Sequence, residues 1–267
     1  MSNQAFLLDD GLPASAAPGD AVVIDGPEGH HAVTVKRVRP GEQIDVLSGT
    51  GTRAVCTVRE TAKASLTAII DRIEREDEPP VELVLVQALA KGDRDLQAVE
   101  AAVELGIDAI QPWQSDRSVV RWAAAKADKG RAKWAATVRA AVKQSRRTRL
   151  PEVASVMTTQ QLAARLAQPK TQDGPEVAII LHESATEPLS AVVRNFMDEV
   201  AAGDPAAGRP RILLLVGPEG GIADAEISRL TEAGAQTAVL GRHVLRASTA
   251  GPAALVITRH IAGVLDR

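Results

Sequence analysis

The first 75 residues alternate short apolar runs with clusters of turn-forming residues. Five runs have the period of half-buried strands, and they cover residues 21–24, 32–38, 43–47, 52–59 and 64–70. Glycine and proline separate the runs, at Gly26-Pro27, at Pro40-Gly41 and within residues 48–51. No helical period is sustained here. The pattern therefore predicts a small antiparallel β-barrel over residues 1–75.

The pattern changes after an acidic segment, EREDEPP at residues 74–80, which predicts a domain boundary. Continuous apolar runs, typical of strands buried on both faces, cover residues 81–87, 107–112, 177–181, 212–216 and 237–240. Helical patterns cover residues 93–105, 128–147, 191–201, 225–233 and 253–265, with Asp93 and Asp224 as expected N-caps. Residues 168–175 and 204–209 are expected surface loops. Because strands alternate with helices, we expect an α/β domain with a parallel sheet over residues 80–267.

Composition narrows the class of protein. The chain has 267 residues, of which 45% are hydrophobic and 24% charged, as in an ordinary globular protein. No apolar run approaches the ~20 residues of a membrane span, and the N-terminus has no export signal. The single cysteine, Cys56, excludes an internal disulfide and disfavours a cysteine-based metal site. We therefore expect a cytoplasmic protein that binds neither a membrane nor a metal.

Charge is distributed unevenly along the chain. Residues 117–149 hold eleven basic residues against Asp128 alone, so this stretch is +10 while the whole chain is −3. Such a run is usually a solvated helix face, but the acidic residues that normally alternate on that face are missing. The run predicts a phosphate-binding surface. Aromatic residues make up only 2% of the chain, which argues against RNA binding mainly by base stacking.

The segment ILLLVGPEGGIADAEISRL, residues 212–230, carries the first candidate for chemistry. A buried strand runs into the loop from Gly217 to Gly221, and ligands of open parallel sheets bind beyond the carboxyl ends of strands. Glycines let the backbone approach a ligand closely. The loop matches neither a Walker sequence nor G-x-G-x-x-G, and a tight turn without a ligand is an equally good interpretation of this segment alone.

The second candidate is AVLGRHVLRASTAGPAAL at residues 238–255. A strand ends at Gly241, the next helix is expected near Ala250, and the loop between them is partly apolar. Loops of this kind are more often functional than idle. The alternative is that Leu245 belongs to the core and Arg246 pairs with a carboxylate.

Together these segments resemble the RsmE family, within the SPOUT class of S-adenosylmethionine-dependent RNA methyltransferases. The resemblance rests on GPEGG, on the pattern L-G-x-x-[VIL]-L-R-x-x-T-A, and on further matches in order: Lys91-Gly92, Glu104-Leu105-Gly106, Arg117, residues 140–153, and His31 with residues 38–41. It covers nearly the whole chain. It implies methylation of N3 of a uridine in 16S ribosomal RNA of the small subunit, by a homodimer.

The resemblance also implies the fold and the sites. Residues 1–75 would form a PUA-like RNA-binding barrel, and residues 80–267 a SPOUT domain with a deep trefoil knot. Three loops would hold the cofactor S-adenosyl-L-methionine: Leu181, His182 and Glu183; Val216, Gly217, Pro218, Glu219, Gly220 and Gly221; and Leu240, Gly241, Val244, Leu245 and Arg246. The expected RNA-binding residues are His31, Arg39, Lys91, Arg94, Arg117, Arg121, Lys143, Arg146 and Arg147.

The sequence departs from the family pattern in three places. Arg242 stands where a proline is common, Ala247-Ser248 replaces Thr-Glu, and Lys143-Gln144 replaces Glu-Gln or Cys-Gln. Because Ser248 cannot act as a carboxylate at neutral pH, we interpret the usual glutamate as never having been the base. The alternative is that another group takes that part here.

Our catalytic hypothesis centres on Arg246, which would lie beside the methyl donor and stabilise the developing uridine anion. His182, His243 and Glu219 are candidate bases, each more often structural than catalytic. Two other functions remain open: a non-catalytic RNA-binding protein with a vestigial cofactor site, and an enzyme acting on a small nucleotide. The latter leaves the basic run and the barrel unexplained.

Overall fold

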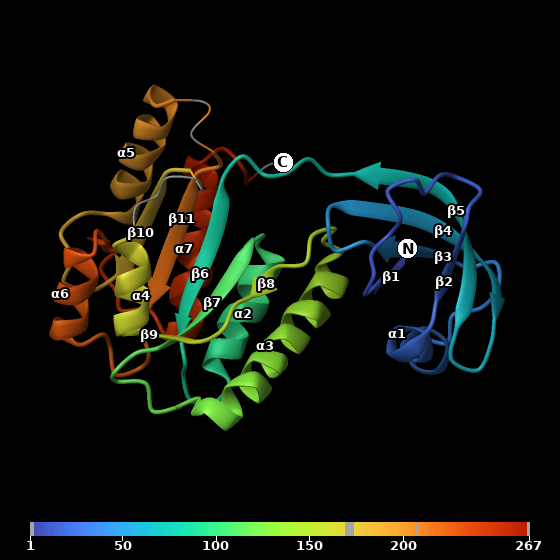
Figure 1. The fold of residues 1–267 in the computed structure, drawn as a ribbon, viewed down its shortest axis with the longest axis horizontal. Coiled ribbons are helices and arrows are strands. Elements are labelled where there is room, and N and C mark those ends of the chain that lie inside the picture. The colour runs from blue at the N-terminus through green and yellow to red at the C-terminus, as the bar shows by residue number, and fades with distance from the viewer. Residues whose placement is uncertain (1–2, 169–173, 205, 207, 266–267) are drawn as a thin grey trace. The chain divides into compact units, whose positions relative to one another are not determined.

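A computed structural model describes residues 3–168, 174–204, 206 and 208–265 of the chain (Figure 1). The chain divides into two compact units. One comprises Met1–Glu78 with Arg139–Leu150, and the other comprises Pro79–Val138 with Pro151–Arg267. The division crosses the long helix α3 (Ala124–Ser145), so a segment that the sequence assigned to the second domain belongs to the first unit.

The first unit is built on a five-stranded sheet with the order β1-β3-β4-β5-β2. The strands are β1 (Gln4–Leu7), β2 (Ala21–Ile24), β3 (Gln43–Leu47), β4 (Thr52–Thr61) and β5 (Leu66–Arg75). Alternate residues such as Ile24, Ile44 and Leu66 face one apolar core. β1 runs parallel to β3, whereas every other pair in this sheet is antiparallel. The all-antiparallel prediction is therefore wrong for β1, a four-residue strand too short to show a period.

The predicted strand at 32–38 is also wrong. Helix α1 (Gly26–His30) continues directly into a π-helical turn, η1 (His31–Val35). Pro27 in the first turn presets the helical φ. A Cβ on Gly29 would lie 2.4 Å from the carbonyl oxygen of Ala64, so only glycine lets α1 lie this close to the strand ends. Tertiary packing overrides the strand preference of the β-branched residues here, because the helical turn buries Ala32.

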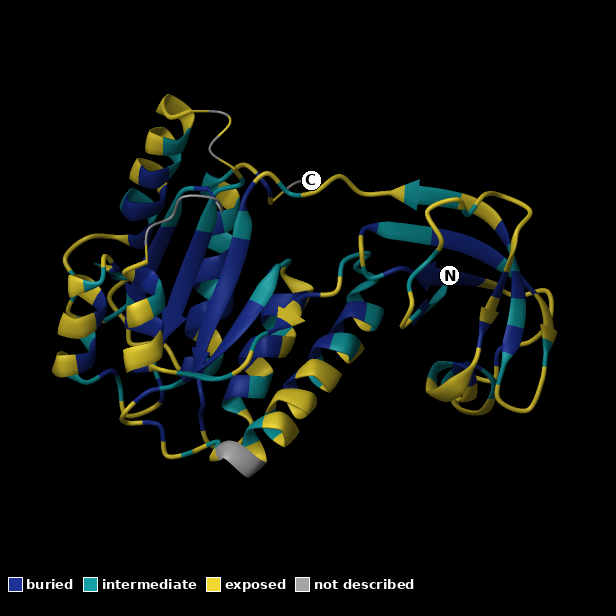
Figure 2. Cartoon of the chain, viewed as in Figure 1, coloured by how far each residue is buried: buried dark blue, intermediate teal, exposed yellow. Residues whose placement is uncertain are grey.

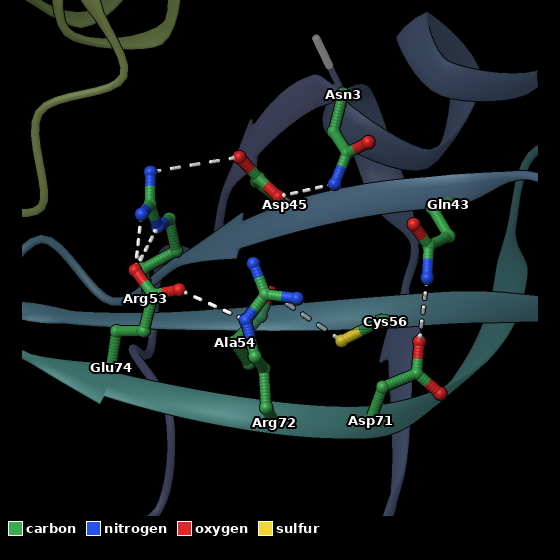
Figure 3. Close-up of polar contacts among 9 residues, drawn as sticks. All are labelled: Asn3, Gln43, Asp45, Arg53, Ala54, Cys56, Asp71, Arg72 and Glu74. Carbon is green, nitrogen blue, oxygen red and sulfur yellow. Dashed lines mark hydrogen bonds and ion pairs between the residues drawn. The ribbon is translucent and has the colours of Figure 1, made fainter.

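Polar contacts cross the strands of this sheet (Figure 3). Nε of Arg53 on β4 donates to Glu74 on β5 at 2.9 Å, and Asn3 donates to the buried carboxylate of Asp45 at 2.8 Å. Hydrogen bonds from Arg53 and Arg72 hold the pKa of Glu74 below its ordinary value. These pairs join neighbouring strands in one register.

Cys56 lies among the apolar side chains of this unit, and its Sγ donates to the carbonyl of Ala54. Burial raises the pKa of this thiol to about 12. Cys56 is therefore an inert core residue at neutral pH.

The second unit contains a seven-stranded, wholly parallel sheet. Its strands are β6 (Glu82–Ala88), β7 (Ala109–Gln114), β8 (Glu152–Val153), β9 (Met157–Thr158), β10 (Glu176–Leu181), β11 (Arg211–Val216) and β12 (Gln236–Ala238). Their order is β12-β10-β11-β6-β7-β8, with β9 also pairing with β7. The predicted α/β class with a parallel sheet is confirmed.

Helices cover both faces of this sheet, so its central strands are buried throughout (Figure 2). One face packs against α4 (Thr159–Leu166) and α6 (Asp224–Glu232). The other side packs α7 (Ala247–Ile261), which contacts β6, β11, α2 (Arg94–Glu104) and α5 (Leu189–Ala202). Among the described residues, no helix combines the length and apolar character needed to cross a bilayer.

Four local predictions in this unit need correction. Helix α7 begins at Ala247, which shortens the loop after β12, and α4 has no counterpart among the predicted helices. Asp93 occupies the N-cap of α2 with φ +57° and makes no capping bond. The N-cap of α6 is Ala223 rather than Asp224, and the side chain of Glu226 accepts its backbone N–H.

The predicted surface loops lie partly outside the described residues, at 169–173 and at 205 and 207.

Candidate active site

A cavity of about 360 Å³ opens at the carboxyl ends of β10 and β11. Three loops line it, which follow β10, β11 and β12. Residues predicted to bind a cofactor supply most of its wall: Leu181, His182, Glu183, Val216, Gly217, Pro218, Glu219, Gly221, Val244, Leu245 and Arg246. The loops that follow β11 and β12, at residues 217–221 and 240–246, thus border one hollow, as parallel strands that end at one edge allow.

Three predicted residues lie elsewhere. Leu240 and Gly241 line a smaller adjoining hollow of about 70 Å³, together with His243. Gly220 lines neither, because its carbonyl turns toward Arg117 and accepts a hydrogen bond from Nη1 at 3.1 Å.

The sequence missed four lining residues. Ile222, Ala247 and Ala250 were not assigned to the site, and Arg94 was assigned to RNA alone. Ala247 and Ala250 share one face of the first turns of α7. A predicted helix that began at Ala247 would have placed both alanines beside the cavity.

The loop after β11 has no room for side chains at its first glycine. A Cβ on Gly217 would lie 2.6 Å from Cγ1 of the buried Ile222. At the other end, Gly221 has φ +70° and its N–H donates to the carbonyl of Pro218 at 2.9 Å. Bare backbone therefore borders the cavity at Gly217, and a ligand there meets main-chain atoms.

Glu219 is tied to the turn that precedes α2. Its Oε1 accepts the backbone N–H of Lys91 at 2.9 Å and Nη1 of Arg94 at 3.0 Å. Burial acts to raise the pKa of Glu219, but backbone hydrogen bonds and Arg94 outweigh it and lower the pKa below 4.5. A carboxylate with a lowered pKa and two donors is a poor general base.

The histidines near the cavity differ in their surroundings. The backbone N–H of Ser184 donates to Nδ1 of His182 at 3.3 Å, and Nε2 lies 3.9 Å from the carboxylate of Glu183. His182 is held within its own loop, whereas His243 is exposed. These contacts orient the His182 ring within the turn after β10.

Arg246 is exposed, occupies the N-cap of α7 and lines the cavity. Among the described residues it forms no ion pair, so its charge is available to a ligand. Leu245 is 38% exposed. The alternative in which Leu245 is core and Arg246 pairs with a carboxylate is therefore wrong.

Comparison with known proteins agrees with this geometry. A family model described as an RNA methyltransferase domain matches residues 77–259, and one described as an RNA methyltransferase PUA domain matches residues 24–71. The ribosomal RNA small subunit methyltransferase E of Mycobacterium bovis is 42% identical over 248 residues, which are 92% of this chain and 87% of that protein. The chain belongs to this family of RNA methyltransferases.

Other members of the family match over similar lengths. The methyltransferase E of Bacillus subtilis is 32% identical over 228 residues, 85% of each chain. The crystal structure of the Neisseria gonorrhoeae methyltransferase E bound to S-adenosyl methionine superimposes with a TM-score of 0.77 at 27% identity, covering 97% of this chain and 98% of that one. The family assignment from sequence motifs is confirmed.

The basic residues of the methyltransferase domain are held to different degrees. Lys91, Arg117 and Arg121 are exposed, although Arg117 donates to Gly220 and Arg121 donates to the carbonyl of Asp116 at 2.6 Å. Arg94 is half-buried against Glu219. The guanidinium groups of Arg117 and Arg121 thus help to hold the turn after β7 in place through these hydrogen bonds. They also expose positive charge at the surface.

The basic residues of the first unit form two groups. Lys143 is paired with Glu28 at 3.0 Å, and both side chains are largely buried. His31 packs edge-on against Phe6, with ring centroids 6.4 Å apart, and burial together with Lys143 lowers its pKa. His31 is therefore uncharged at neutral pH.

Arg39 is exposed, and Arg146 is half-exposed with φ +58°. Arg147 is half-exposed and already engaged by neighbouring groups. Of the predicted RNA-binding residues in this unit, Arg39 and Arg146 are the most accessible cations.

Proposed function

We propose that this methyltransferase transfers a methyl group from S-adenosylmethionine to N3 of a uridine in 16S ribosomal RNA of the small subunit. The proposal includes action in the cytoplasm as a homodimer. The observation that carries it is the cavity that the loops after β10, β11 and β12 line together. That cavity, at about 360 Å³, is within the usual size of a cofactor site.

The residues of the cavity fit the chemistry of this cofactor. Bare backbone at Gly217 suits hydrogen bonding to an adenine edge, and Val216, Ile222 and Leu245 offer apolar contact. The first N–H groups of α7 have no intrahelical acceptor and suit a carboxylate. When bound, S-adenosylmethionine supplies an electrophilic methyl group on a positively charged sulfur.

Arg246 has the clearest catalytic role in the proposal. Uracil N3 carries a proton, so the nucleophile gains negative charge as that proton passes to solvent water. A guanidinium at the cavity wall stabilises this charge on N3 and the neighbouring carbonyl oxygens. Because Glu219 is held by Lys91 and Arg94, it does not serve as the base.

Recognition of RNA rests on both domains in the proposal, the PUA-like barrel at 1–75 and the SPOUT domain at 80–267. Exposed Arg39 and half-exposed Arg146 in the first unit, and exposed Lys91, Arg117 and Arg121 in the second, contact phosphates. His31 contributes as a neutral hydrogen-bonding ring. Lys143 acts indirectly, by pairing with Glu28 of α1.

We include the trefoil knot in the proposal. Its support is the path of the chain before α7: Val239 exchanges backbone hydrogen bonds with Glu187 and Leu189, which precede and begin α5. The chain then continues into α7, which packs on β6 and β11 near the middle of the sheet. A segment that enters the middle of a sheet beside an earlier loop has the course that such a knot requires.

The decisive test is a map of methylated uridines in 16S RNA from cells with and without this protein. We expect one N3-methyluridine to disappear when the protein is absent and to return with the wild-type chain. Calorimetry with S-adenosylmethionine separates the enzyme from a non-catalytic RNA-binding protein, for which no heat of binding is expected. An unchanged methylation map would refute the proposed substrate.

A further inference from the structure

Glu226, on the first turn of α6, is a buried carboxylate that the cavity itself does not contain. Its side chain is 1% exposed. Oε2 accepts Ser115 Oγ at 3.0 Å and the backbone N–H of Ala223 at 3.2 Å, and Oε1 accepts the backbone N–H of Asp116 at 2.9 Å and Thr159 Oγ1. A carboxylate accepts in all these directions, so every contact is satisfied.

The four donors come from three separate segments. Ser115 and Asp116 begin the turn after β7, Thr159 begins α4, and Ala223 is the N-cap of α6. The hydroxyl of Thr159 also accepts Nε1 of Trp113 at 3.0 Å, which leaves its proton for Glu226. Glu226 therefore joins the turn after β7 to the helix that follows the glycine loop.

The turn held by Glu226 contacts that glycine loop directly. Arg117, next after Asp116, donates from Nη1 to the carbonyl of Gly220 at 3.1 Å. A Cβ on Gly220 would lie 3.4 Å from Cβ of Arg117, so the backbone of the loop approaches the turn closely. Glu226 thus supports the 217–221 loop at two points. One is Ala223, which follows the loop in the chain, and the other is the turn that carries Arg117, which contacts Gly220.

We propose that Glu226 is a positioning residue of this methyltransferase, which sets the affinity for S-adenosylmethionine by fixing the 217–221 loop through the turn that carries Arg117. This inference rests on the proposed function, because it concerns the same cofactor. It adds a residue that touches neither the cavity nor RNA. It also makes Arg117 a support of the cofactor loop in addition to a phosphate contact.

Glutamine cannot replace Glu226 in this arrangement. Each carboxylate oxygen accepts one backbone N–H, from Ala223 or from Asp116, and a backbone N–H cannot turn into an acceptor. Whichever way the amide is placed, its NH2 group therefore faces a backbone donor. Glu226→Gln keeps the shape of the side chain and breaks one of the two connections.

The experiment measures the dissociation constant of S-adenosylmethionine by calorimetry, without RNA, for wild type, Glu226→Gln, Arg117→Ala and the double variant. Glu176→Gln is the matched control. Glu176 is a buried carboxylate of the same unit, but it lies at the start of β10 and pairs with Arg165 at 2.6 Å. Thermal unfolding midpoints are recorded for every variant.

We expect Glu226→Gln to weaken binding about tenfold, the loss of roughly 1.4 kcal/mol, and Arg117→Ala to weaken it about threefold, roughly 0.65 kcal/mol. The double variant should bind no more weakly than Glu226→Gln, because both changes release the same loop. Arg117→Lys, which can still donate to Gly220, should bind like wild type. Glu176→Gln should lower the unfolding midpoint and leave the affinity unchanged.

Several results would overturn the inference. These are wild-type affinity in Glu226→Gln, effects that multiply in the double variant, or equal loss of affinity in Glu176→Gln. If Glu226→Gln does not fold, Arg117→Ala decides alone, and wild-type affinity in that variant refutes the proposal. A wild-type chain that binds no S-adenosylmethionine refutes the proposed function instead, which keeps the two failures distinct.

Discussion

Nη1 of Arg94 lies 3.0 Å from Oε1 of Glu219, and the two residues are 125 positions apart in the sequence. Arg94 begins α2, and Glu219 lies in the loop after β11. The same oxygen accepts the backbone N–H of Lys91. Glu219, the central residue of the GPEGG motif, therefore links the loop after β11 to the start of α2. It serves as an anchor between these two walls of the cavity.

Replacing this anchor is expected to cost stability in a pH-dependent way. Glu219 has a folded pKa below its ordinary value of 4.5, so it contributes stability that is present above that value and lost as pH falls through the lowered pKa. Glu219→Gln should lower the free energy of unfolding at pH 7 by about 0.5–1 kcal/mol, the range of a partly exposed pair. Denaturant unfolding at pH 7 and near pH 4 measures this. A difference from wild type that stays constant or grows at the lower pH would contradict the assignment.

Gly217 is expected to tolerate no side chain. The added methyl of Gly217→Ala would meet Cγ1 of Ile222 at 2.6 Å, and overpacking of this kind costs about 1–3 kcal/mol. Because the loop must shift to relieve the clash, the affinity for S-adenosylmethionine should fall about tenfold, roughly 1.4 kcal/mol. Gly203→Ala, at the end of α5, is the control: its nearest neighbour is 3.3 Å away and it lies outside the cavity. Equal affinities in the two variants would show that the loop is not tightly packed.

The convergence of the loops could be predicted from the sequence, whereas several of the contacts that hold them could not. Apolar runs followed by glycine place residues 217 and 241 at the carboxyl ends of parallel strands, and topology brings such ends to one edge. Nothing in the sequence pairs Glu226 with Ser115, because their 111 positions of separation are closed only by tertiary folding. Asp224 looked the better cap for α6, since local propensity favours Asp at the cap itself rather than a glutamate three residues later.

In the first unit, a tertiary backbone contact overrides the local sequence pattern in one segment. Its strands follow the apolar alternation, but residues 31–35 form a helical turn although Val-Thr-Val favours a strand. The deciding contact is the close approach of Gly29 to the backbone of Ile24 and Ala64, which involves no side chain at that position. Local pattern cannot reveal a helix that is fixed by the absence of a side chain.

Two basic residues near the end of α3 should respond differently to removal. Lys143→Ala leaves the largely buried carboxylate of Glu28 without its ammonium partner and should destabilise the first unit by about 1–3 kcal/mol. Arg146→Ala should leave stability within about 0.5 kcal/mol of wild type, as surface changes do, because arginine and alanine each carry a Cβ at this positive φ of +58°. Unfolding midpoints of the two variants measure the contrast.

RNA binding provides a further test of Arg146. Arg146→Ala should weaken binding to 16S RNA and reduce the slope of log K against log salt by about 1, because one phosphate contact is lost. Its affinity for S-adenosylmethionine should not change. Filter binding over a range of salt concentrations measures the slope, and an unchanged slope would remove Arg146 from the RNA surface.

Arg246 offers the sharpest separation of catalysis from stability. Its guanidinium forms no ion pair among the described residues, so Arg246→Ala should leave the unfolding midpoint close to that of wild type. Loss of one preorganised group that stabilises a developing anion lowers turnover by about 10²–10³-fold, and we expect that loss at saturating RNA and cofactor. Arg246→Lys should recover only part of the rate, because an ammonium lacks the fork of donors that spans N3 and a carbonyl oxygen. Arg242→Ala, an exposed arginine of the same loop that lines neither hollow, is the matched control and should retain wild-type turnover. Normal turnover in Arg246→Ala would assign charge stabilisation to another group, while equal losses in both variants would indicate that the loop rather than the guanidinium matters.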